Sequence, residues 1–204
     1  MPRVKVGRKS TAIDMTAMCD VAFLLLTFFI LSAKPKVQEP LPAEVPASTA
    51  TFTIPETDFS TLTVAQGKVF FNVQGAEIRV ETLKLMGEKY GINFTPQEQQ
   101  QFAGVESFGV PVNTLKQYLA LSSEQKSSYQ QPGIPTDTTD TSELSEWVRS
   151  ARKANAGTTG VQLNIAIKGD SKEEYPTIKK VIMTLQKQKV NKFNLITSLK
   201  TLTK

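Results

Sequence analysis

The feature that most constrains this chain is an apolar run near its start, from Met15 to Ala33, in which the only charged residue is Asp20. A helix that crosses a bilayer needs about 20 apolar residues, within a range of roughly 17 to 25. A helix also satisfies its own backbone hydrogen bonds in hydrocarbon, where water cannot do so. The sequence therefore predicts a transmembrane helix over residues 13–33.

Asp20 needs an explanation, because a charged Asp at the centre of a spanning helix costs about 2.5–3.5 kcal/mol on insertion scales. One alternative is that the helix begins after Asp20 and runs only from Val21 to Ala33. At about 1.5 Å per residue, so short a helix does not cross a hydrocarbon core of roughly 30 Å. We therefore expect Asp20 to lie inside the span, in a cavity lined by a partner, where it takes up and releases protons.

Helical geometry predicts which residues accompany Asp20. At about 100° per residue, Thr16, Asp20, Leu24 and Thr27 fall on one stripe and form a supporting intramembrane face. Asp14 lies about 240° away from Asp20 around the helix axis, so the two carboxylates do not share a proton. We expect Asp14 at the cytoplasmic surface, near the helix N-terminus, where a carboxylate is favourable.

The run from Ile13 to Val21, with the Leu-rich sequence that follows it, resembles the signature of the ExbD/TolR biopolymer-transport family. Ala17 stands where a proline is usual in that signature. The resemblance implies that Asp20 is the proton-carrying aspartate and that Thr16 matches the upstream threonine of the motif. The stretch from Ile165 to Thr197 also resembles the C-terminal signature of the family.

The resemblance implies an ExbD-like motor subunit that is driven by the proton motive force. Two copies of the helix would lie inside a pore formed by an ExbB-like multi-spanning protein, giving a homodimer within a hetero-oligomer. The soluble part would pass force to a TonB-like protein that works outer-membrane receptors. One alternative is a TolR-like subunit in envelope maintenance, and another is a membrane-anchored periplasmic binding or scaffold module.

Composition excludes several other classes of function. The chain has 204 residues and a formal net charge of +5, but its charges are distributed along the sequence, which argues against nucleic-acid binding. It has no histidine and a single cysteine, Cys19, so His/Cys metal sites and Cys–His catalysis lack their ligands. Glu173 and Glu174 precede an expected helix, where acids are favourable. We expect no cofactor, no metal and no enzymatic activity.

The N-terminal residues 1–12 form a basic tail without acids, which favours a cytoplasmic N-terminus. Lys34 and Lys36 after the span oppose this orientation. No clear small-x-small cleavage site follows the apolar run, so we expect an uncleaved signal-anchor. With the resemblance, this predicts a single-pass protein of the bacterial inner membrane with a periplasmic C-terminal domain.

Residues 34–60 are rich in proline and predict a semi-rigid periplasmic linker. In the family, this segment can add as a strand to a neighbouring subunit, and the alternation of Phe52 and Ile54 suits a strand. A plain tether fits the sequence equally well.

Residues 61–204 predict a periplasmic domain of the α+β class, with helices packed on a small mixed β-sheet. A hairpin of strands 61–65 and 69–73 opens it, and a strand–helix–strand unit over 161–197 with parallel strands closes it. Residues 91–140 resemble an insertion relative to short family members. Helices are expected over 80–90, 96–102, 112–121, 142–154 and 175–189, with a loop over 127–141 and Trp147 in the core. We expect Gly91 to end the first of these helices and a capping box of Thr95 and Glu98 to start the second.

Overall fold

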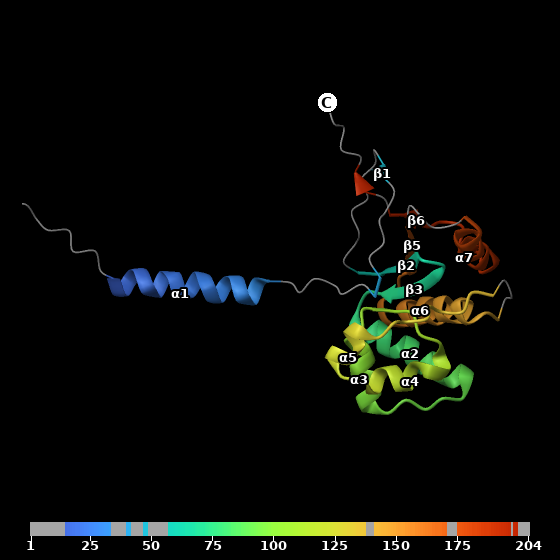
Figure 1. The fold of residues 1–204 in the computed structure, drawn as a ribbon, viewed down its shortest axis with the longest axis horizontal. Helices are drawn as coiled ribbons and strands as arrows, with labels where there is room; N and C mark the ends of the chain where they lie inside the picture. The colour runs from blue at the N-terminus through green and yellow to red at the C-terminus, as the bar shows by residue number, and fades with distance from the viewer. Residues whose placement is uncertain are drawn as a thin grey trace, which may run out of the picture. The chain divides into compact units, whose positions relative to one another are not determined.

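The computed structural model describes residues 15–33, 40–41, 47–48, 57–137, 141–170, 175–196 and 198–199. The chain divides into two units, Met1–Val37 and Gln38–Lys204. The first unit contains the N-terminal helix, and the second contains the sheets and the remaining helices (Figure 1). This is an α+β architecture with one apolar helix ahead of a small mixed sheet.

Helix α1 extends from Met15 to Ser32 and is continuous through Asp20. Its 18 residues give a length of about 27 Å. The alternative in which the helix begins at Val21 is wrong, because the preceding residues include Ala17 and Met18, which are good helix formers and continue the same helix.

The domain is built on a five-stranded mixed sheet in the order β4-β3-β2-β5-β6. β2 is antiparallel to β3 and parallel to β5, and β5 is parallel to β6. The parallel arrangement predicted for the C-terminal strand–helix–strand unit is confirmed. The strands are β2 (Phe59–Ala65), β3 (Lys68–Val73), β4 (Ser107–Phe108), β5 (Asn164–Gly169) and β6 (Asn194–Leu195).

The predicted hairpin is confirmed, and its turn explains why it forms. Ala65 pairs with Lys68, so only Gln66 and Gly67 lie between the strands. Both turn residues have positive φ, 54° and 71°. A two-residue turn with this backbone matches the right-handed twist of the flanking strands.

Within its described residues the domain has six helices, which include all five of the expected ones. Gly91, in the left-handed conformation, ends α2, and the predicted capping box of Thr95 and Glu98 starts α3. The sequence missed α5 and β4, because elements of six and two residues are too short for a periodic pattern. The helices are α2 (Ala76–Tyr90), α3 (Pro96–Ala103), α4 (Val112–Ala120), α5 (Ser123–Ser128), α6 (Glu143–Thr159) and α7 (Tyr175–Lys187).

Several predicted boundaries were wrong by a few residues. α2 begins at Ala76 rather than residue 80, directly after Gly75 with its positive φ of 91°. α6 continues five residues beyond the predicted end and stops at Gly160, in the left-handed conformation. The following strand consequently begins at Asn164 rather than residue 161.

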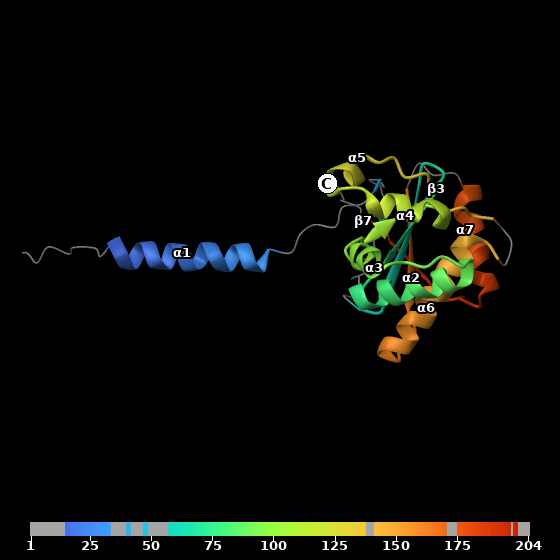
Figure 2. The same ribbon diagram turned by 90° about the horizontal axis from the view of Figure 1, so that it is seen from below.

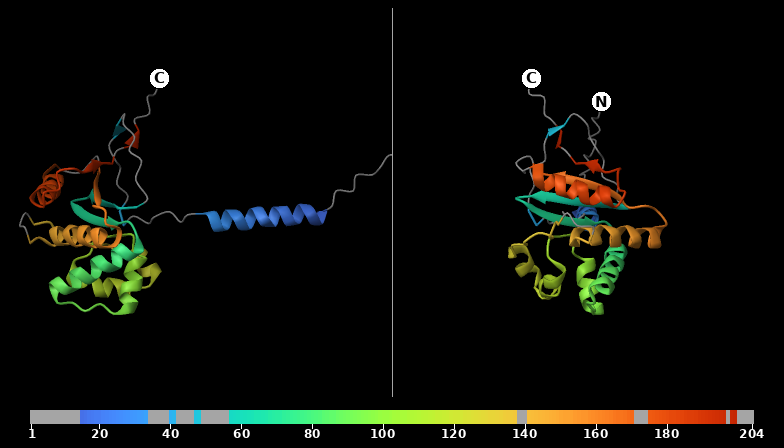
Figure 3. Two further views of the ribbon diagram at one scale, coloured as in Figure 1. Left: turned by 180° about the vertical axis from the view of Figure 1, so that it is seen from behind. Right: turned by 90° about the vertical axis from the view of Figure 1, so that its right-hand side faces the viewer.

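One hydrophobic core lies between the helices and one face of the sheet. Alternate residues of the strands, such as Leu62 and Phe71, cluster with Trp147 of α6. Trp147 is fully buried, as predicted, and its ring stacks on Phe102 at a centroid distance of 6.0 Å. Figure 3 shows α6 alongside the β2–β3 hairpin, and Figure 2 shows α2, α3 and α4 gathered next to α6.

Residues 91–137 are part of this core rather than a separate module. They provide α3, β4, α4 and α5, and β4 pairs with β3 in the same sheet. Phe102, Phe108 and Leu115 from this stretch are each at most 2% exposed. The predicted loop over 127–141 is confirmed for residues 129–137 and 141, whereas residues 127 and 128 end α5; residues 138–140 lie outside the described part of the chain.

A second, two-stranded sheet joins β1 (Ala47–Ser48) to β7 (Ser198–Leu199) in parallel. A strand does therefore form within the predicted linker, and it pairs with the C-terminal end of the same chain. Phe52 and Ile54, which suggested such a strand, lie outside the described residues.

Candidate functional site

Helix α1 presents apolar side chains over its whole surface. None of its residues is buried, and its large hydrophobic residues are 53–86% exposed. Its mean hydropathy is 2.0 over 18 residues. A continuous apolar surface of this kind is stable only when lipid or another protein covers it. By length and composition, α1 is able to cross a membrane.

Asp20 lies one and a half turns into α1, and it is the only charged residue of the helix. Because α1 is regular over this stretch, Thr16, Asp20, Leu24 and Thr27 share one stripe of its surface. The carboxylate thus lies on an otherwise uncharged helix, with Thr16 one turn before it and Leu24 one turn after it. Asp14, the predicted cytoplasmic-side carboxylate, lies outside the described residues.

The hydroxyl of Thr27 is not a partner of Asp20 in this structure. Thr27 Oγ1 donates a hydrogen bond to the carbonyl of Leu24 at 2.9 Å. Seven residues separate Thr27 from Asp20, or about 10 Å along the helix axis, which is beyond hydrogen-bond reach. Of the two threonines on the stripe, only Thr16 is close enough to Asp20 along the helix.

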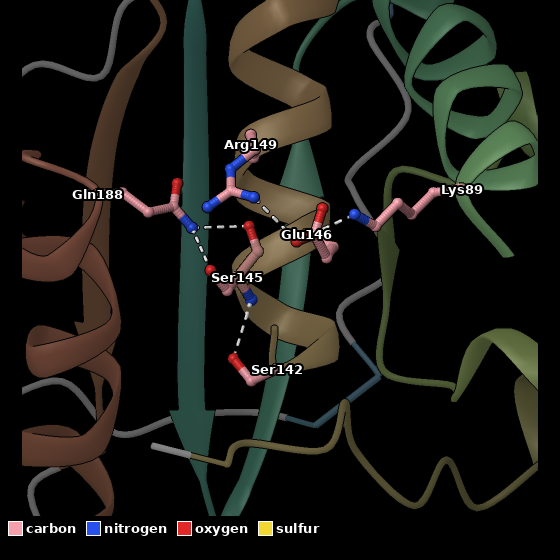
Figure 4. A network of polar contacts seen from close by, with 6 residues as sticks. All are labelled: Lys89, Ser142, Ser145, Glu146, Arg149 and Gln188. Carbon is pink, nitrogen blue, oxygen red and sulfur yellow. Dashed lines mark hydrogen bonds and ion pairs between the residues drawn. The ribbon is translucent and has the colours of Figure 1, made fainter. Parts of the chain in front are cut away.

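A polar network ties three helices of the domain together (Figure 4). Glu146 of α6 is 4% exposed. Its Oε1 lies 2.9 Å from Nη1 of Arg149 and 3.9 Å from Nζ of Lys89 in α2. Gln188, directly after α7, donates from Nε2 to the backbone oxygen of Ser145 at 2.6 Å and to its hydroxyl at 2.7 Å. The network holds α2 and α7 against α6, and the i,i+3 spacing of Glu146 and Arg149 was its only sequence signal.

A second cluster fixes the start of β2, and sequence reasoning missed it. Oδ1 of Asp58 accepts hydrogen bonds from Thr159 Oγ1 at 2.8 Å and from Asn155 Nδ2 at 2.9 Å. These two bonds, the first above all, lower the pKa of Asp58 from its ordinary value. The backbone carbonyl of Asp58 accepts a bond from Asn164 at 2.8 Å. The end of the linker is thereby attached to α6 and β5.

Glu143 connects α6 with the segment that resembled an insertion. Its Oε1 accepts a hydrogen bond from the backbone N–H of Val112, the first residue of α4, at 2.7 Å. The same oxygen accepts a bond from Trp147 Nε1 at 3.3 Å. Burial raises the pKa of Glu143, and the two hydrogen bonds offset part of that rise.

These clusters have structural roles, and none has the composition of a metal centre. No group of three or more Asp, Glu or Cys residues able to hold a metal ion occurs within the described part of the chain. Glu173 and Glu174 lie outside that part. Asp20 belongs to none of these clusters and lies on a helix that has no buried residue.

Comparison with known proteins gives one match. The model of the family described as biopolymer transport protein ExbD/TolR matches residues 7–200, which is nearly the whole chain. No curated protein and no solved structure matches the chain significantly. The matched region includes α1 with Asp20, the linker, residues 91–137 and the closing strand–helix–strand unit. With its single apolar N-terminal helix and its small mixed sheet, this single-pass membrane protein belongs to the ExbD/TolR family of biopolymer transport proteins.

Proposed function

We propose that this chain is an ExbD-like motor subunit in which Asp20 carries the protons whose flow drives movement. The observation that carries the proposal is a lone carboxylate on an uncharged 18-residue helix, in a chain that the family model matches over residues 7–200. Neutralising Asp20 removes the cost of moving it past an apolar wall, so protonation gates movement of the helix.

A single helix makes no channel, so the proton route requires a partner. We propose an ExbB-like multi-spanning protein around two copies of α1, with Thr16, Leu24 and Thr27 on the face that meets it and Asp14 at the cytoplasmic side. One elementary charge moved across 100 mV is worth about 2.3 kcal/mol, so substantial work takes several protons. The domain then passes force across the periplasm to a TonB-like protein.

The decisive test is Asp20→Asn in the complex with the multi-spanning partner, reconstituted in liposomes. Asn has nearly the same shape as Asp but does not ionise, so we expect proton flux to fall at least about tenfold, to background. Cys19→Ala is the matched control, because it changes the neighbouring residue on a different helix face and should leave the flux unchanged. Flux that persists in Asp20→Asn, in a complex that still assembles, contradicts the proposal.

The alternatives are separable by experiment. A TolR-like subunit uses the same mechanism with a different client, so crosslinking from the domain in cells identifies a TonB-like or a TolA-like partner. In an anchored scaffold module, α1 serves only as a tether. Replacing α1 by a neutral Leu-rich span would preserve a scaffold function and abolish the motor.

A further inference from the structure

The domain has a hollow of about 320 Å³ beside α4 and α5 that the motor proposal does not use. Most of its lining belongs to α4, α5 and the stretch that follows them. One lining residue, Pro40, comes from the linker, nineteen residues before the first residue of β2. The lining residues are Pro40, Ser107, Tyr118, Lys126, Ser127, Tyr129 and Gln131.

Two tyrosine rings form the apolar wall of the hollow. Tyr118 and Tyr129 lie with their centroids 5.6 Å apart and their planes at 51°. Nζ of Lys126 lies 5.8 Å from the Tyr118 centroid, a cation–π contact. Tyr118 is 5% exposed and Tyr129 is 40% exposed, so one ring belongs to the domain and the other faces outward. Paired aromatic rings of this kind are the usual receptor for proline in extended peptides.

The wall is fixed before anything binds to it. Gln131 is 6% exposed, accepts a hydrogen bond from the backbone N–H of Gly109 and donates one to the Tyr118 hydroxyl at 3.2 Å. Burial raises the pKa of Tyr118 and lowers the pKa of Lys126, as expected for a site from which water is partly excluded. A preformed site loses little conformational freedom when it takes up its ligand.

The linker supplies a matching ligand. Pro40 and Leu41 are both half-buried, although they precede the sheet by many residues. The sequence Pro40-Leu41-Pro42 favours extended chain, because proline fixes its own φ and restricts the residue before it. We propose that the tyrosine wall is a proline-binding site, that Pro40, which lines the same hollow, is its ligand within the chain, and that their contact clips the linker onto the domain.

The clip sets how far the domain can move from the end of α1. From Ala33 to Pro40 the chain spans at most about 25 Å, at roughly 3.5 Å per residue. Without the clip, the next described attachment of the linker is the pairing of Ala47 in β1 with Ser198 in β7, and the reach from Ala33 rises to roughly 50 Å. An extended proline-rich segment of a partner would compete with Pro40 for the same rings and release the longer reach.

Disulfide trapping in the full-length protein tests the clip. The background is Cys19→Ala, which removes the only native cysteine, and the reporter pair is Leu41→Cys with Ser127→Cys. The control pair is Leu41→Cys with Thr158→Cys, because Thr158 is exposed on α6 and lines a different pocket. If the clip holds residue 41 at the hollow, the disulfide between residues 41 and 127 of one chain should form about tenfold faster than the disulfide between residues 41 and 158.

A second comparison links the crosslink to the tyrosine wall. Tyr129→Ala removes the exposed ring and should lower the 41–127 rate to that of the control pair, whereas Tyr129→Phe keeps the ring and the rate. The fluorescence of Trp147 verifies that both variants remain folded. Equal rates for the two cysteine pairs, an unchanged rate in Tyr129→Ala, or a crosslink that joins two chains would each overturn the clip. None of these outcomes depends on Asp20, so the test is separate from that of the motor.

Discussion

At the scale of single residues, Asp20 and Glu143 show which acidic side chains a sequence can single out. Asp20 stands out in the sequence because a charge within an apolar run is costly. Glu143 was not, since it looks like an ordinary acid in the first turn of a helix. Its burial, and its bond to Val112 in a segment about thirty residues away, depend on tertiary packing. The role of Asp58 was hidden for the same reason.

Glu143 carries a prediction about pH. Because burial raises its pKa from the ordinary value of 4.5, the folded chain binds more protons than the unfolded chain between pH 4.5 and the raised value. Its contribution to the free energy of unfolding therefore decreases as pH rises through that window. Glu143→Gln does not ionise but keeps an acceptor for the N–H of Val112. Between pH 5 and pH 7.5, we expect its free energy of unfolding to fall less than that of wild type.

Trp147 is the only tryptophan, so its fluorescence during urea unfolding at the two pH values measures this difference. Gln117→Ala, on the exposed side of α4, serves as the control and should show the same pH dependence as wild type. Parallel pH dependence in wild type and Glu143→Gln would show that the Glu143 carboxyl titrates normally.

At the scale of elements, the sequence predicted those whose signals are local. The hairpin turn, the capping box of α3 and the glycine stop of α2 depend on neighbouring residues alone, and each was correct. β4 is two residues long, and its pairing with β3 comes from a distant part of the chain, so no local pattern marks it. The same holds for the pairing of β1 with β7.

The packing of residues 91–137 gives a prediction at this scale. Leu115 of α4 is fully buried in the common core, so Leu115→Ala should destabilise the whole domain by about 2–5 kcal/mol in a single transition. Gln117→Ala, on the exposed side of the same helix, should cost little. Urea unfolding followed by Trp147 fluorescence and by circular dichroism measures both. Two separate transitions in Leu115→Ala would mean that the segment unfolds as its own unit.

At the scale of the whole molecule, the position of β2 determines how the domain carries mechanical load. The linker leads directly into β2, which is central in the sheet and is paired along nearly its whole length with both β3 and β5. Traction applied at Thr57 therefore strains the hydrogen bonds of two ladders together, in shear. β6 is an edge strand of two residues, and traction applied there peels it from β5 alone.

Single-molecule pulling should accordingly give a higher rupture force from a handle at Thr57 than from one at Leu195, with the second handle at Gln117 in both cases. Equal rupture forces from the two handles would mean that the choice of strand does not determine how strongly the domain resists unfolding. In the proposed motor, a domain loaded through its central strand would withstand repeated traction without losing its sheet, whereas one loaded through an edge strand would unfold at the first strong pull.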